Sequence, residues 1–116
     1  MEYFKCHAGE LAYVFGDVSS ELEERDGLDV PFSQLVIDYW TAFVRTGNPN
    51  PDLAFLKARG YTNTVAQVLG KGLWAPVDPA SPRLRLLQWG ARESMEAFQD
   101  LQQCEVLGFP LDYFEA

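Results

Sequence analysis

His7 is the only histidine in the 116-residue chain and the side chain best suited to move protons. An imidazole changes its protonation state near neutral pH, so histidine is the most frequent general base in enzymes. An apolar pair precedes His7, and a glycine-glutamate step leads from it into an apolar run that ends at Gly16. This order predicts a strand over residues 2–6, a loop that presents the imidazole, and a short helix or turn over residues 10–15.

A histidine base needs a nucleophile, and the sequence offers serines at positions 19, 20, 33, 81 and 94. None of them has glycine both two residues before and two residues after it, as the Gly-x-Ser-x-Gly nucleophile elbow requires. Cys6 adjoins His7, but neighbouring residues of a strand point to opposite faces. The pattern therefore disfavours a nucleophile within this chain.

Cys6, His7 and Glu10 are residue types that bind metals, and they lie close together in the sequence. Structural zinc usually takes four ligands from two spaced pairs, so this single cluster disfavours a metal site. We predict no cofactor. The acidic stretch over residues 17–29 has six carboxylates against one arginine, which favours a solvated loop over a docking or metal site.

The composition fits one globular domain, or part of one, over residues 1–116. Hydrophobic residues make up 47% of the chain, which is enough for a core. A net charge of −8 disfavours binding to nucleic acids and to anionic membranes. The sequence shows neither an apolar run of about 18 residues nor a signal-peptide core. Two cysteines, Cys6 and Cys104, do not define a disulfide framework, so their pairing stays open.

The clearest helix is expected over residues 32–46. Apolar side chains recur there at helical spacing, and the side predicted to be buried carries Phe32, Val36, Tyr39 and Phe43. Gly47 and the Asn-Pro-Asn-Pro run after it should end the helix. We interpret the aromatic set of Tyr39, Trp40 and Phe43 as core rather than as a ligand cage, with Trp40 off the main stripe.

The remaining pattern predicts helices over 52–59, 61–69 and 92–107, a loop over 70–82 and a strand over 84–89. Two short strands cannot build the buried parallel sheet of an α/β protein, so in isolation the chain is predicted to be mostly α. Its helices must then cover one another, or a sheet supplied from elsewhere. A second copy or a partner chain is expected to contact Val36, Trp40, Trp89 and the aromatic tail over 109–114.

Four segments, in a fixed order, resemble a known family. They are His7-x-Gly9-Glu10-Leu11-x-Tyr13-Val14-Phe15-Gly16, then Ser33-x-x-Val36-x-x-Tyr39-Trp40-x-x-Phe43-x-x-Thr46-Gly47-Asn48-Pro49-Asn50, then Trp74-x-Pro76 with Leu84-Arg85-Leu86, and finally Cys104. The set resembles the C-terminal segment of the type-B carboxylesterase and lipase family, α/β-hydrolases that include the cholinesterases. Ala8 stands where that family often has glycine, and residues 52–73 match poorly and look like an insertion.

The resemblance implies an α/β fold and a serine ester hydrolase. His7 would be the general base of a Ser-acid-His triad, and Glu10 would support it from the first turn of the next helix. The nucleophile and the acid lie upstream in that family, so the chain alone is expected to be inactive. A carboxylic ester would be its substrate only within a full-length parent. The alternative is a stand-alone helical binding or oligomeric module that derives from this segment and has no catalytic role.

Overall fold

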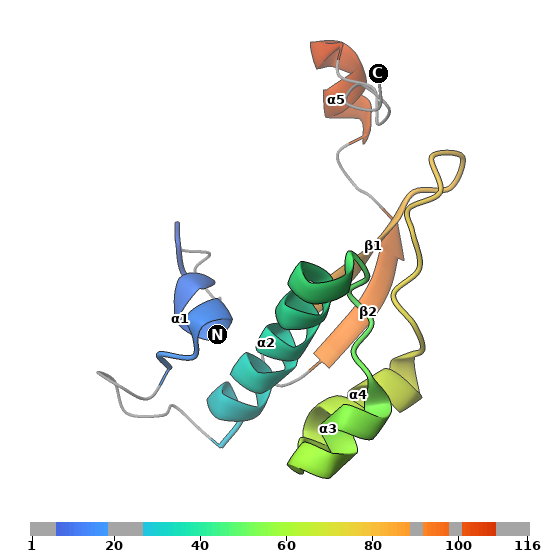
Figure 1. The fold of residues 1–116 in the computed structure, drawn as a ribbon. Helices are drawn as coiled ribbons and strands as arrows, with labels where there is room; N and C mark the ends of the chain where they lie inside the picture. Colours follow the sequence, from blue (N-terminus) through green and yellow to red (C-terminus); the bar gives the residue numbers. More distant parts are fainter. Residues whose placement is uncertain (1–6, 19–26, 89–91, 98–100, 109–116) are drawn as a thin grey trace.

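The structure is a computed structural model that describes residues 7–18, 27–88, 92–97 and 101–108 (Figure 1). Its elements, in chain order, are α1 (Leu11–Phe15), α2 (Asp29–Thr46), α3 (Leu53–Arg59), α4 (Thr62–Lys71), β1 (Arg83–Gln88), β2 (Arg92–Ala97) and α5 (Leu101–Leu107). The described part is mostly helical and holds one two-stranded antiparallel sheet. The strand expected over 2–6, Trp89 and the tail over 109–114 lie outside the described residues.

Helix α2 is the longest element and the centre of the molecule, with α1 on one side and the hairpin of β1 and β2 on another (Figure 1). It begins at Asp29, three residues earlier than predicted, and the Phe32 amide donates to the Leu28 carbonyl at 3.0 Å. Pro31 is tolerated because the first-turn amides of a helix have no partner within it. Gly47 ends α2 as predicted, with a φ of 72° that favours glycine.

The hydrophobic core forms around the buried face of α2. The core cluster consists of Phe32, Leu35, Val36, Tyr39 and Val68, and Tyr13, Val14, Leu53, Trp74 and Leu87 pack against it. Of the four α2 residues predicted to be buried, three are in the core. Phe43 is the exception, because it lines an open cavity instead of packing in the core and is 57% exposed. Val36, expected at an exposed contact, is instead buried.

Helices α3 and α4 follow α2, and both were predicted from the sequence within a few residues. The Asp52 carboxylate caps α3 by accepting hydrogen bonds from the amides of Ala54 and Phe55 at 2.7 and 3.2 Å. Helix α4 packs on α2, where the Asn63 side-chain amide donates to the Pro31 carbonyl at 3.2 Å. These contacts bring the segment between the Asn-Pro-Asn stop and Trp74 onto the core.

The sequence prediction of one helix over 92–107 is wrong. Residues 92–97 form β2, which pairs antiparallel with β1 from Arg83↔Ala97 to Gln88↔Arg92, and only Leu101–Leu107 is helical. The segment Arg-Glu-Ser-Met-Glu-Ala is rich in residues that favour helices. As a strand, however, it pairs with the backbone amide and carbonyl groups of β1. Tertiary pairing therefore overrides local propensity here.

Helix α5 lies beyond the hairpin and apart from α2 (Figure 1). Among the described residues, no helix has the length and apolar character needed to cross a membrane.

Candidate functional site

His7 is exposed and lies in a turn over residues 7–10 that leads directly into α1. Ala8 has a φ of 62°, and it is the one non-glycine residue with a positive φ in the described part of the chain. The Leu11 amide donates to the Ala8 carbonyl at 3.2 Å, which joins the turn to the helix. The left-handed backbone therefore falls at the position where the resemblance expects glycine.

Glu10 lies at the N-cap of α1, one position before the first turn in which it was expected. Its carbonyl accepts the amides of Tyr13 and Val14, each at 3.0 Å, while its exposed carboxylate accepts no capping hydrogen bond. Within the described residues no hydrogen bond joins Glu10 to His7. The backbone of Glu10, rather than its charge, is what connects the turn to α1.

Tyr13 fastens α1 to the N-terminal half of α2. Its hydroxyl donates to Asp29 Oδ1 at 3.0 Å, and its carbonyl accepts the Ser33 hydroxyl at 2.9 Å. Its ring meets the Phe32 ring edge-on, with 4.9 Å between centroids. Ser33 is buried at this contact. Asp29 was predicted to belong to a solvated acidic loop, but it is only 3% exposed.

Gly16 brings the end of α1 against α2. Its φ is 78°, and a Cβ atom added there would lie 3.2 Å from Ile37 Cδ1. A side chain at this position would meet both steric and conformational resistance. The glycine that ends the short helix is thus needed for the close approach of α1 and α2.

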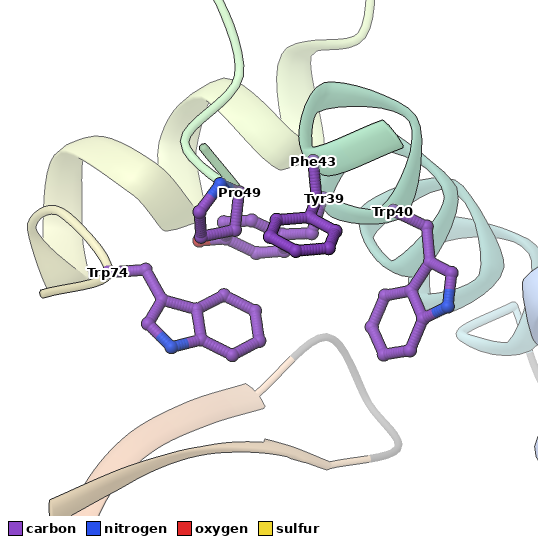
Figure 2. Close-up of a pocket in the computed structure, with 5 residues that line it drawn as sticks. All are labelled: Tyr39, Trp40, Phe43, Pro49 and Trp74. Carbon is purple, nitrogen blue, oxygen red and sulfur yellow. The ribbon is translucent and has the colours of Figure 1, made fainter. Parts of the chain in front are cut away.

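An aromatic cavity of about 320 Å³ opens at the C-terminal half of α2 (Figure 2). Its described lining consists of Tyr39, Trp40, Phe43, Pro49 and Trp74. The prediction that the three α2 aromatics form the core is correct only for Tyr39, because Trp40 and Phe43 are 44% and 57% exposed. Trp74 lies edge-on to Tyr39, with 5.3 Å between ring centroids. Sequence spacing could not reveal this cavity, since Trp74 is 34 residues from Trp40 along the chain.

Asn50 holds Trp74 in the cavity wall by two backbone hydrogen bonds. Its Oδ1 accepts the Trp74 amide at 2.6 Å, and its Nδ2 donates to the Trp74 carbonyl at 3.0 Å. Asn48 Oδ1 accepts in turn from the Asn50 backbone amide and Nδ2 at 2.9 and 2.8 Å. Hydrogen bonds therefore join two of the segments that resemble the family, residues 46–50 at the end of α2 and the segment that begins at Trp74.

Arg85 supports the same wall from β1. It is 7% exposed, its Nη2 donates to the Gly72 carbonyl at 3.1 Å, and its guanidinium carbon lies 6.0 Å from the centre of the Trp74 ring. Leu84 and Leu86, on the opposite face of the strand, are partly exposed. Alternation alone would have placed the two leucines inward.

Asp38 is a buried carboxyl that joins α2 to α4. Its Oδ2 accepts the Thr64 hydroxyl at 2.5 Å and its Oδ1 accepts the Gln34 amide at 2.9 Å. Burial raises the pKa of the Asp38 carboxyl, and the two hydrogen bonds, which favour the charged form, only partly offset it. The Thr64 bond joins Asp38 to α4, and the Gln34 bond lies within α2.

The described residues contain no group of three or more His, Cys, Asp or Glu side chains that could hold a metal ion. Cys6 and the side chain of Cys104 lie outside what the structure describes, so their pairing stays open.

Comparison with known proteins identifies the family. No solved structure matches the chain. The sequence model of the carboxylesterase family matches residues 3–106, a span that includes the His7 turn, α2, the Trp74 segment and the hairpin. The match covers most of the 116 residues, and the chain therefore belongs to the carboxylesterase family.

Proposed function

We propose that this chain supplies the histidine of a Ser-acid-His triad to a carboxylic ester hydrolase. His7 takes the proton from the serine hydroxyl as the serine oxygen attacks the ester carbonyl, and it then gives that proton to the leaving alcohol. In the second half of the reaction, water replaces the serine and the acyl group leaves as a carboxylic acid. Membership of the carboxylesterase family carries this proposal, and the exposure of His7 in its turn supports it.

The serine and the acid of this triad come from sequence outside the chain. None of the serines in the 116 residues lies in a Gly-x-Ser-x-Gly elbow. Ser33 is buried, and its hydroxyl donates a hydrogen bond to the Tyr13 carbonyl. Asp29 and Asp38, two buried acids of α2, are bonded to Tyr13 and to Thr64. Glu10 is a supporting residue in this proposal, and its part is to continue the turn into α1.

The same proposal explains the apolar surface of the helices. Leu11 and Phe15 of α1, and Trp40, Phe43 and Val44 of α2, are all between 44% and 80% exposed. Apolar surface of this extent favours a covering partner. We propose that the covering surface is the part of a carboxylesterase that bears the nucleophile. A second copy of the chain would cover it if the chain is instead a binding or oligomeric module.

Residues 52–73 are proposed to be an insertion in the family segment. An insertion is tolerated when its two ends lie close together, and the Asn50–Trp74 hydrogen bonds join the residues that flank this stretch. The stretch forms α3 and α4 and contributes Leu56, Thr64 and Val68 to the buried part of the molecule. It therefore packs on α2 and does not extend away from it.

A grafted esterase tests the proposed function. Residues 3–106 replace the matching segment of an active carboxylesterase, and hydrolysis of an activated ester is measured for this graft and for its His7→Ala variant. The proposal predicts hydrolysis that His7→Ala lowers about a thousandfold or more. The isolated 116-residue chain should hydrolyse the same ester no faster than its own His7→Ala variant. Equal activity of the two grafts would contradict the assignment of His7.

A further inference from the structure

The His7 turn and α1 form one hydrogen-bonded unit. The Leu11 amide donates to the Ala8 carbonyl, and the amides of Tyr13 and Val14 donate to the Glu10 carbonyl. The position of the turn, and with it the imidazole of His7, therefore depends on the position of α1. A histidine base must lie within hydrogen-bond reach of the serine hydroxyl, so a displacement of about 1 Å matters for catalysis.

Helix α1 cannot fix that position by itself. It has five residues, none of which is buried. Isolated helices shorter than about 12 residues are marginal in water, so a five-residue helix needs contacts from elsewhere. Among the described elements, α2 is the one that packs closely against α1. What holds α1 on α2 therefore also holds His7.

Three contacts from one residue join these helices. Tyr13 donates its hydroxyl to Asp29 Oδ1, accepts the Ser33 hydroxyl at its carbonyl, and packs its ring edge-on against Phe32. The three partners lie at positions i, i+3 and i+4 of α2, on one face of the helix, and each is less than 9% exposed. Tyr13 therefore contacts three neighbouring residues of α2 that are buried in the folded chain.

We propose that Tyr13 is the positioning residue for His7, an inference that rests on the proposed function. Through its hydroxyl, its carbonyl and its ring, Tyr13 sets the distance of α1 from the first two turns of α2. It thereby sets where the imidazole meets the serine of the triad. Tyr13 itself contacts neither the substrate nor the reacting atoms. Ser33 acts with it as the donor on α2.

The first test measures amide hydrogen exchange in the full 116-residue chain. Tyr13→Phe removes the hydroxyl and keeps the ring on Phe32, and Tyr61→Phe is the matched control, because the Tyr61 hydroxyl accepts only an exposed contact from Arg59 at 3.4 Å. Tyr13→Phe should speed exchange in residues 8–16 about tenfold and leave α3 and α4 unchanged. Exchange in residues 8–16 no faster than in the control overturns the inference. If Tyr13→Phe fails to fold, Ser33→Ala takes its place, with exposed Ser81→Ala as its control.

The second test separates positioning from stability in the grafted esterase. Tyr13→Phe should lower kcat about tenfold to a hundredfold with KM unchanged, whereas Tyr61→Phe should change neither. An unchanged kcat, or an equal loss in both variants, overturns the inference. If the graft with Tyr13 intact shows no hydrolysis that depends on His7, the proposed function fails. The exchange measurement still decides in that case whether Tyr13 holds the turn.

Discussion

Ala8 carries the conformational cost of the His7 turn. A left-handed backbone costs a residue with a Cβ atom about 1–2 kcal/mol, and glycine avoids this cost. The turn is nevertheless closed by the Leu11–Ala8 hydrogen bond and continued by α1. An alanine is held in this conformation because the structure around it requires the turn.

Replacing Ala8 by glycine should stabilise the chain. The strain relieved exceeds the added flexibility of the unfolded chain, so Ala8→Gly should raise the free energy of unfolding by about 0.5–1 kcal/mol. Ala66→Gly, in the exposed middle of α4, should lower it by a similar amount. Urea titration of the three proteins measures both changes. If both variants are destabilised equally, Ala8 is not strained.

Asp38 makes stability depend on pH. The pKa of its carboxyl is raised above 3.8 in the folded state, so the folded protein binds that proton more tightly than the unfolded chain does. The contribution of Asp38 to stability should therefore fall as the pH rises from about 4 through the raised folded-state pKa. Asp38→Asn should remove this fall and be at least as stable as the native chain at neutral pH. Denaturant titrations of both proteins at a series of pH values test this sign. A native chain that gains stability relative to Asp38→Asn as the pH rises would contradict it.

The Thr64 hydroxyl donates a hydrogen bond that stabilises the charged form of the Asp38 carboxyl. Thr64→Val keeps the shape and removes the 2.5 Å hydrogen bond to Asp38. The loss should cost about 1.5–3 kcal/mol at neutral pH, because a buried carboxylate then loses a donor. The cost should shrink at low pH, where the carboxyl is neutral. If Thr64→Val loses the same stability at both pH values, the loss comes from packing and not from the charge of Asp38.

Among the helices, local signals predicted α2, α3 and α4, together with the end of α2 at Gly47. These helices have apolar residues at helical spacing and a cap or a breaker at their ends, so their positions can be predicted from neighbouring residues alone. The hairpin was missed because β2 exists only through its pairing with β1. The aromatic cavity was missed for the same reason, since Trp74 reaches it through hydrogen bonds to a distant asparagine.

Phe43 and Leu35 should differ sharply on truncation, although both are apolar residues of α2. Leu35 is fully buried, so Leu35→Ala should cost about 2–5 kcal/mol. Phe43 is 57% exposed, so Phe43→Ala should cost about 1 kcal/mol or less. Thermal or urea unfolding of the two variants compares them directly. A loss above about 3 kcal/mol for Phe43→Ala would show that another surface covers this side chain.

The Asn50 hydrogen bonds to Trp74 are testable by a pair of closely matched changes. Asn50→Asp replaces the donor to the Trp74 carbonyl by an acceptor and should cost about 1–3 kcal/mol. Asn48→Asp keeps the oxygen that accepts from Asn50, and should change stability by less than about 0.5 kcal/mol. Tryptophan fluorescence during unfolding reports both. Equal losses would show that the amide of Asn50 does not hold the Trp74 segment.

The described core is small relative to the apolar surface that the chain leaves exposed. Seven hydrophobic residues are buried, whereas fifteen large hydrophobic residues are exposed in the described part of the chain. Trp40 is 44% exposed and stays a candidate for the expected contact, whereas Val36 is buried in the core. Surface of this kind predicts association at micromolar concentration, measured by sedimentation velocity. A cooperatively melting monomer that binds no hydrophobic dye would favour a closed, stand-alone module.

The family was readable from the sequence because its motifs are local runs of residues, and the match over residues 3–106 confirms it. The catalytic assignment depends on groups that this sequence does not contain. The most direct measurement is the rate at which a fluorophosphonate labels the serine of the grafted esterase, because labelling needs an activated serine but no particular ester. If His7 is the base of the triad, His7→Ala should slow labelling about a thousandfold, while Glu10→Gln should slow it far less. Equal labelling rates with and without His7 would show that His7 is not the base that activates the serine.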